Sequence, residues 1–171
     1  MLEEVSKALG YSIINKVEAV RRCSDKLLML KTLRWAGVKT LEFYSLRNFL
    51  DFIKAWLAMK VGGKKLVMRR FDNALIEIVA SEKDFVQSLD LFDYATVLEE
   101  KRLEWRALVF RGKVFKLMLK EPDDENAFAL KQSNCKFRNI KIFETKVIAE
   151  CEKAAKALGM DLCGVDVCLN K

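Results

Sequence analysis

Residues 104–120 read EWRALVFRGKVFKLMLK, and this segment has the clearest structural pattern in the chain. Apolar and polar side chains alternate on both sides of Arg111 and Gly112, as they do in strands that bury one face. A two-residue connection that contains glycine is typical of a tight turn between antiparallel strands. The segment therefore predicts a β-hairpin, with Arg106 inside its first strand.

The last residues, LGMDLCGVDVCLNK from Leu158 to Lys171, predict the end of a helix followed by another strand. Gly159 is placed to stop a long amphipathic helix that begins at about Phe143. Beyond it, Asp166 stands between two valines, so we expect a carboxylate in a buried strand. An acid in such a place is either satisfied by backbone donors or used to bind a ligand.

The segments before the hairpin show helical and strand patterns in turn. Ser24 is placed to cap a helix in SDKLLMLKTLRWAG, and Ser45 is placed to cap a second amphipathic helix after a short strand, VKTLEFY. Gly62 and Gly63 mark a turn before KKLVMRRF and NALIEIVA, which predict paired strands. Ser81 begins a capping-box-like helix start, and the strand YATVLEE follows. This order predicts an α+β fold in two small lobes with mainly antiparallel sheets.

The composition excludes several kinds of chemistry. The chain has 171 residues, a formal net charge of +7 at pH 7 and no histidine. Ser-His-Asp and Cys-His nucleophilic catalysis and imidazole acid–base chemistry are therefore excluded. The positive charge favours an anionic partner, such as a nucleotide, a nucleic acid or an acidic substrate. A nucleic-acid-binding protein stays an alternative, although the positive stripe and exposed aromatic residues that it needs are not evident.

Cysteine spacing and the length of the apolar runs limit the environment of the protein. The five cysteines lack CxxC spacing, which favours reduced, packed thiols over a zinc site. Charges interrupt the apolar runs before the roughly twenty residues that a membrane span requires, and the first residues, MLEEVSKALG, are acidic rather than basic. We therefore expect a soluble, cytoplasmic protein.

Four segments in the same order resemble the ATP-grasp superfamily, most closely its branch of ribosomal-protein S6 glutamate ligases and glutathione synthetase-like enzymes. INKVEAVRRCSDKLLMLKTLRWAGVKT is similar to the N-x-x-E-A-I and D-K segment of that branch, and KLVMRRF stands where the branch has LVVKP. The hairpin is similar to D-[IV]-R-[VA]-x-V-[VL]-x-G-x-[VA]-x-x-A-x-x-R. IAECEKAAKALGMDLCGVDV is similar to A-x-x-A-A-x-A-L-G-L-x-x-A-G-V-D. The match runs from about Asn15 to Asp166, nearly the whole chain.

The resemblance implies a two-lobed ATP-grasp core. Residues 1–14 correspond to the remnant of a preceding domain or a linker, 15–95 to the amino-terminal lobe, and 96–171 to a carboxy-terminal lobe that is incomplete at its end. The implied activity is that of an ATP-dependent carboxylate–amine, or thiol, ligase, or of part of one, acting through an acyl phosphate. The implied ligands are ATP, Mg²⁺ and a carboxylate substrate, and a protein partner or a homo-oligomer is compatible with the same interpretation.

The resemblance also implies roles for single residues. Arg106 is implied to face the transferred phosphate or the acyl phosphate, and Asp166 is implied to bind magnesium. The other implied contacts are Lys26 and Arg69 with the phosphates, where Arg69 replaces the usual lysine, Glu99 and Glu100 with adenine and ribose at the hinge, and Lys131 and Asn134 beside the same cleft. Each role has a plainer alternative, since surface charges, a turn asparagine and a structural acid leave the same pattern in a sequence.

Three features of the branch are missing from this sequence. A complete preceding domain is not present, the expected glycine-rich flap reads DNALIEIVAS without a glycine, and the E-x-N strand that carries the other metal ligands does not follow. A single carboxylate holds Mg²⁺ weakly, because the ion prefers a full octahedral oxygen shell. Two explanations stay open: the sequence is part of a longer ligase, or it is a degenerate, noncatalytic module that binds a nucleotide or a protein partner.

Overall fold

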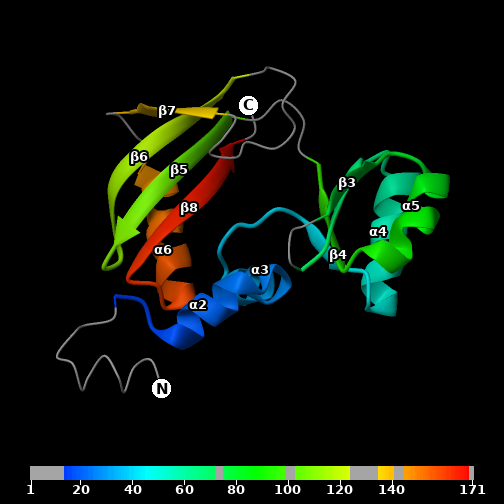
Figure 1. The fold of residues 1–171 in the computed structure, drawn as a ribbon, viewed down its shortest axis with the longest axis horizontal. Coiled ribbons are helices and arrows are strands. Elements are labelled where there is room, and N and C mark those ends of the chain that lie inside the picture. The colour runs from blue at the N-terminus through cyan, green and yellow to red at the C-terminus, as the bar shows by residue number, and fades with distance from the viewer. Residues whose placement is uncertain (1–13, 72–74, 99–102, 124–134, 141–144, 170–171) are drawn as a thin grey trace.

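The computed structural model describes residues 14–71, 75–98, 103–123, 135–140 and 145–169, and these residues form two four-stranded antiparallel sheets with helices packed against them (Figure 1). The predicted α+β class with mainly antiparallel sheets is confirmed. The first sheet has the strand order β1-β4-β2-β3 and the second β7-β6-β5-β8. The strands are β1 Phe43–Ser45, β2 Leu66–Arg69, β3 Ile76–Val79, β4 Tyr94–Val97, β5 Leu103–Phe110, β6 Lys113–Pro122, β7 Cys135–Asn139 and β8 Leu162–Leu169.

Two helices cover one face of the first sheet. They are α4, Phe49–Lys60, and α5, Glu82–Ser88, which continues into a short 3-10 turn, Leu89–Leu91. The side chain of Phe85 is fully buried between them and stacks on Phe52 with 5.7 Å between ring centroids. Leu66 and Met68, two residues apart on β2, point into the same core because alternate residues of a strand share a face.

One long helix, α6 (Thr145–Leu158), covers one face of the second sheet. Ala107 and Val109 of β5 are fully buried against Cys151 and Ala155 of this helix. No helix in the described part of the chain is long and apolar enough to cross a bilayer.

The β5–β6 hairpin confirms the prediction made from residues 104–120. Arg111 and Gly112 have φ angles of 47° and 76°, so both turn residues are in the left-handed region. This pair of positive φ angles is the one that a type I′ hairpin turn requires. The strands remain paired from Glu104 with Lys120 to Phe110 with Lys113, with one shift of register after Leu108.

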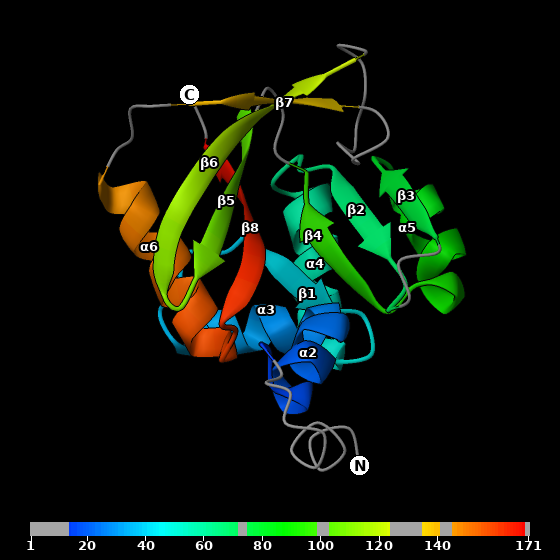
Figure 2. The same cartoon turned by 60° about the vertical axis from the view of Figure 1, so that its left-hand side comes forward.

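Helices α2 (Val17–Ser24) and α3 (Lys26–Trp35) join the two sheets. Both helices contact α6, and Leu27 of α3 packs with Phe43 and Tyr94 of the first sheet. Figure 2 shows α2 and α3 below the two sheets. A lobe boundary at residues 95–96 stays a prediction, because these helices contact both parts.

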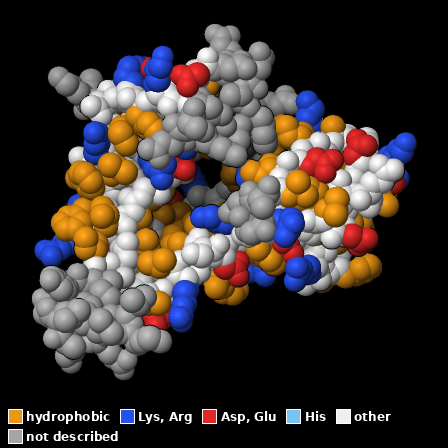
Figure 3. Space-filling view, in the orientation of Figure 1, with side chains coloured by type: hydrophobic (Ala, Val, Ile, Leu, Met, Phe, Trp, Pro, Cys, Tyr) orange, Lys and Arg blue, Asp and Glu red, His pale blue; other side chains and the backbone are white. Residues whose placement is uncertain are grey.

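The face of the first sheet opposite α4 and α5 looks toward the face of the second sheet opposite α6. In Figure 1, α4 and α5 lie on the side of the first sheet away from the second, and in Figure 2, α6 lies on the side of the second sheet away from the first. The space-filling view shows a hollow between the two halves, bordered by basic side chains (Figure 3). A ligand that binds between the sheets therefore meets residues from both.

The predicted helix cap at Ser24 is wrong. Ser24 is the last residue of α2, and its hydroxyl donates to the carbonyl oxygen of Val20 at 3.0 Å. Asp25 is extended and caps α3 by accepting the amide N–H of Leu28 at 2.9 Å. The chain breaks between the two helices one residue later than the pattern predicts, so the acid rather than the hydroxyl reaches the free amides.

The predicted cap at Ser45 is also wrong, and the strand before it is shorter than VKTLEFY. Only residues 43–45 pair with β4, and Ser45 lies opposite Tyr94 in that ladder. After Ser45 the chain turns through Leu46 and Arg47, and the side chain of Asn48 caps α4 by accepting the amide N–H of Asp51 at 3.1 Å. The predicted cap at Ser81 is confirmed, as is the antiparallel pairing of β2 with β3.

Candidate functional site

The face of the second sheet opposite α6 carries a cluster of four charged side chains. Trp105, Ala107 and Val109 of β5 pack against α6, so the residues between them point to the other face. The register of β5 with β6 and β8 then brings charged groups from three strands onto that face. We call Glu104, Arg106, Lys120 and Asp166 the open-face cluster.

Lys120 is at the centre of the open-face cluster. Its Nζ lies 2.9 Å from Asp166 Oδ1 and 3.6 Å from Glu104 Oε2. The side chains of Lys120 and Glu104 are only 4% and 9% exposed, whereas those of Arg106 and Asp166 are 36% and 51% exposed. The cluster therefore has a buried ion pair at one end and two groups that reach solvent at the other.

The prediction of a buried Asp166 is wrong. Val165 and Val167 point toward α6, so Asp166 between them points away from the helix and is half exposed. Its carboxylate is held by Lys120 and, at 3.8 Å, by Nε of Arg106. Alternating valines indicate one buried face of a strand, and the acid belongs to the other face.

Gly164 leaves the space in which the guanidinium of Arg106 lies. A Cβ atom built at residue 164 would stand 2.6 Å from Arg106 Nε and 2.9 Å from Nη2, closer than nonbonded atoms approach. Gly164 is two residues from Asp166 on the same face of β8, diagonal to Arg106 in the register. The guanidinium of Arg106 thus lies between a residue without a side chain and a carboxylate.

Arg69 lies on the corresponding face of the first sheet. Leu66 and Met68 point toward α4 and α5, so Arg69 points to the opposite side, next to Tyr94 in the ladder with β4. Burial raises the pKa of the Tyr94 hydroxyl; the nearby Arg69 charge acts to lower it and the Asp25 charge to raise it. The start of α3 and the end of β2 therefore meet around Tyr94.

Lys26 has a structural contact in this structure. Its Nζ donates to the carbonyl oxygen of Cys23 at 3.1 Å, at the end of α2, where free carbonyl groups attract cations. Its contact with phosphate stays a prediction. Glu99, Glu100, Lys131 and Asn134 lie outside the described residues, so their roles also stay predictions.

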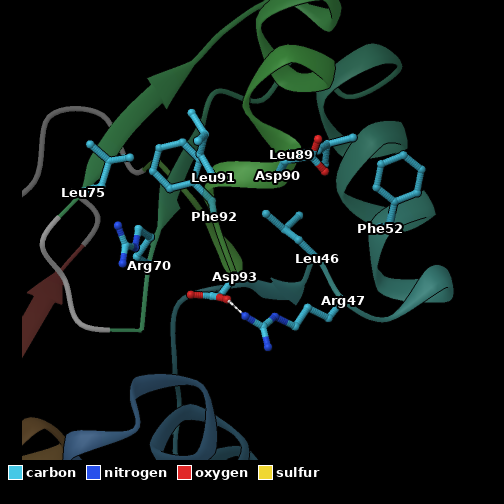
Figure 4. Close-up of a pocket in the computed structure, with 10 residues that line it drawn as sticks. All are labelled: Leu46, Arg47, Phe52, Arg70, Leu75, Leu89, Asp90, Leu91, Phe92 and Asp93. Atoms are coloured by element: carbon cyan, nitrogen blue, oxygen red, sulfur yellow. Dashed lines mark hydrogen bonds and ion pairs between the residues drawn. The ribbon is translucent and has the colours of Figure 1, made fainter.

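A cavity of about 590 Å³ lies among residues of the first sheet and its covering helices, apart from the open-face cluster (Figure 4). Arg47 and Asp93 form an ion pair at its edge, and Asp93 Oδ2 also accepts the amide N–H of Phe71 at 2.8 Å. The other lining residues are Leu46, Phe52, Arg70, Leu75, Leu89, Asp90, Leu91 and Phe92. Asp93 thus ties the end of β2 to the start of α4, which makes it a structural acid.

The open-face cluster offers one carboxylate, Asp166, that suits a divalent cation. It is half exposed and lies on the same face as Arg106, and Mg²⁺ at nucleotide sites commonly takes one or two carboxylates and completes its shell with phosphates and water. The described residues contain no group of three cysteine, aspartate or glutamate side chains placed to hold a metal. Asp166 therefore fits one ligand of such an ion and not a complete site.

Comparison with known proteins identifies the fold. No protein-family model and no curated protein matches the chain by sequence. The ATP-grasp ligase PsnB, complexed with a minimal precursor, Mg and ADP, matches with a TM-score of 0.69 and 17% identity, over 95% of this chain and 50% of its own. D-alanine–D-alanine ligase from Bacillus anthracis matches at 0.69 and 17%, over 98% and 60%. Phosphoribosylglycinamide synthetase from Anaerococcus prevotii matches at 0.56 and 20%, over 91% and 41%.

The chain therefore has an ATP-grasp-like fold, and it spans about half the length of the ligases that it matches. The similarity does not single out one branch of the superfamily, so the assignment to the S6 glutamate ligase branch stays a prediction. Identities of 11 to 20% show a shared fold and do not show a shared activity.

The sequence interpretation missed three residues of this face: Glu104, Lys120 and Gly164. Glu104 is two residues before Arg106 on the same strand, so period-two alternation places both on one face. Lys120 is opposite Glu104 when the hairpin is counted outward from its turn. It also stands where the resembling segment of the ATP-grasp superfamily ends in arginine, so the sequence does carry a signal for a cation at this position.

Proposed function

We propose that this chain is the ATP-binding module of an ATP-dependent carboxylate–amine, or carboxylate–thiol, ligase. The main support is the position of the open-face cluster, which looks toward the first sheet in a fold shared with ATP-grasp ligases. In this proposal the nucleotide binds between the two sheets, and the location is cytoplasmic, where ATP is abundant.

The reaction class has two transfers. A carboxylate oxygen of the substrate attacks the γ-phosphorus of ATP and ADP leaves; an amine or thiol then attacks the acyl carbon and phosphate leaves. PsnB and the macrocyclase MdnC are described with bound precursor peptides, so a peptide carboxylate is one substrate class to test.

In this proposal each residue binds or orients one part of the nucleotide. Arg106 donates to the transferred phosphoryl group, and its fixed position over Gly164 reduces the entropy lost on binding. Arg69 and Lys26 supply positive charge to the phosphates from the other sheet and from α3. Glu99 and Glu100 contact adenine and ribose, and Lys131 and Asn134 line the same cleft. Asp166 provides a carboxylate ligand for Mg²⁺, which neutralises phosphate charge when bound.

Isothermal titration calorimetry with ATP and ADP, with and without Mg²⁺, tests the proposal. Arg106→Ala is expected to weaken nucleotide binding about tenfold or more, the effect of losing a charge-assisted hydrogen bond. Arg138→Ala is the matched control, because Arg138 lies opposite Leu119 on the other face of the same sheet and pairs with Glu121 at 2.6 Å. An absence of binding at millimolar nucleotide, or equal weakening by both variants, contradicts the nucleotide site.

A second candidate function is a noncatalytic nucleotide-binding module. It is favoured by the segment after β2, because residues 70–80 contain no glycine and a segment without glycine does not let its backbone approach phosphate closely. The ion pair of Asp166 with Lys120 favours it as well.

Release of ADP separates the two candidates. The chain is incubated with MgATP, mixed carboxylates and amines, and ADP is measured by a coupled assay. Turnover that disappears in Arg106→Ala supports the ligase. Nucleotide binding without turnover above background supports the noncatalytic module for this chain.

A further inference from the structure

Lys120 reaches across a neighbouring strand to Asp166. Lys120 lies on β6 and Asp166 on β8, with β5 between them, so two strand spacings, about 9.6 Å, separate their strands across the sheet. Lys120 is level with Cys168 in the register, so Asp166 is also two residues out of line with it. The two side chains bridge this separation, and Lys120 Nζ lies 2.9 Å from Asp166 Oδ1. The ammonium group is therefore at the carboxylate where a divalent cation is expected to bind.

From this contact we propose that Lys120 is a built-in counter-cation for Asp166 and competes with the divalent cation for that carboxylate. The inference rests on the proposed function and adds a regulation to it: the metal enters only when Lys120 leaves Asp166. Nucleotide phosphates supply the new partner for Lys120, so metal binding depends on nucleotide binding.

Electrostatics supports competition rather than joint binding. An ammonium at 2.9 Å and a guanidinium at 3.8 Å already balance the charge of Asp166. A divalent cation placed at the same oxygen is repelled by both groups, because like charges a few ångströms apart repel even where solvent screens them. The shell of the metal is also short of oxygen ligands in the described part of the chain, so nothing offsets that repulsion before nucleotide arrives.

Lys120 also has a second carboxylate partner, Glu104. Its Nζ is 3.6 Å from Glu104, which is almost as buried as Lys120 itself. After it leaves Asp166, the ammonium keeps this buried partner and avoids the cost of an unpaired charge. Glu104 therefore remains a partner for the ammonium group when Asp166 binds the metal.

Binding of Mn²⁺ in the absence of nucleotide tests the inference, with free Mn²⁺ measured by electron paramagnetic resonance. Lys120→Met keeps the stem and removes the charge, and it is expected to raise the affinity for Mn²⁺ about tenfold. Adding Asp166→Asn to this variant is expected to abolish the gain. Lys116→Met is the matched control, since Lys116 is an exposed lysine on the same face of β6, opposite Leu108; it is expected to leave Mn²⁺ affinity unchanged.

Lys120→Met leaves Glu104 buried without this cation, so the variant can lose stability. Lys120→Met combined with Glu104→Gln removes both charges and serves as the second test protein. The inference is overturned if neither protein binds Mn²⁺ more tightly than the wild type, or if the gain survives Asp166→Asn. If Mn²⁺ affinity rises in the variants but the protein fails to bind ATP, the result supports the competition and contradicts the nucleotide site. If the protein binds ATP but Mn²⁺ affinity does not rise in the variants, the result supports the nucleotide site and contradicts the competition.

Discussion

The guanidinium of Arg106 lies directly over Gly164, so that a Cβ atom at residue 164 would come within 2.6 Å of Arg106 Nε. The two residues belong to adjacent strands, β5 and β8, and lie on the face of the second sheet opposite α6. The nearest atoms belong to the end of a flexible side chain and not to the backbone. A side chain at residue 164 therefore displaces Arg106 without breaking the sheet.

Gly164→Ala is expected to separate stability from binding. The free energy of unfolding should fall by less than about 1 kcal/mol, because alanine suits a strand better than glycine and Arg106 can move away. Nucleotide affinity should fall about tenfold, since the arginine loses its fixed position. Chemical denaturation and calorimetry measure the two effects.

A double-mutant comparison supplies the control for Gly164. If the alanine acts through Arg106, Gly164→Ala adds no further loss of affinity to Arg106→Ala. Additive losses in the double variant would show that Gly164 affects binding by another route.

The position of the α3 cap can be checked by two neighbouring substitutions. Asp25→Ala is expected to lower the free energy of unfolding by about 1 kcal/mol, because it removes the acceptor of the Leu28 amide. Ser24→Ala is the matched control and should cost less than about 0.5 kcal/mol, since its hydroxyl bonds only within α2. A larger effect at Ser24 than at Asp25, measured by urea denaturation, would contradict the observed cap.

The core between the first sheet and its helices depends on Phe85. Phe85→Ala removes a fully buried ring and is expected to destabilise the protein by about 3 to 5 kcal/mol through lost burial and the cavity left behind. Val86→Ala, one residue later on α5 and 56% exposed, should change stability by less than about 0.5 kcal/mol. Similar effects of the two substitutions on the denaturation midpoint would mean that α5 does not pack as described.

The free energy of unfolding should fall slightly at acidic pH as Glu42 becomes protonated. Lys64, whose Nζ lies 2.6 Å from the carboxylate, and then Tyr44, which donates a hydrogen bond to it, hold the pKa of Glu42 below its ordinary value of 4.5. A lowered carboxyl pKa stabilises the fold above about pH 4.5, and this stabilisation is lost as the pH falls through the folded-state value. The pair is largely exposed, so solvent screens it.

Glu42→Gln is therefore expected to cost no more than about 1 kcal/mol at neutral pH. The difference from the wild type should shrink as the pH falls below 4.5 and should also shrink in high salt. Denaturation curves of both proteins at neutral and acidic pH measure this, and a difference that grows toward low pH would contradict the assigned sign.

Local patterns in the sequence were sufficient for the secondary structure of the β5–β6 hairpin and of α6. The alternation around Arg111 and Gly112 follows from strand geometry and from the φ angles of a two-residue turn, both of which are local. Single capping residues were less predictable. Whether Ser24 or Asp25 meets the free amides depends on where the chain leaves one helix, and the packing of α2 and α3 against α6 decides that by one residue.

The open-face cluster could be predicted only in part. Arg106 and Asp166 were found through the resemblance, but the contact of Asp166 with Lys120 requires three strands in register, and two of those strands are separated by about 40 residues of chain. The alternation of residues in β8 predicts that Asp166 and its valine neighbours lie on opposite faces of the strand. It does not predict which of the two faces a helix covers. The sequence by itself therefore determined the α+β elements, the hairpin and the candidate charged residues, because these depend on local geometry and side-chain chemistry. Only the tertiary structure decided that Asp166 is exposed and paired with Lys120, because burial and ion pairing depend on which distant segments fold onto each face of the sheet.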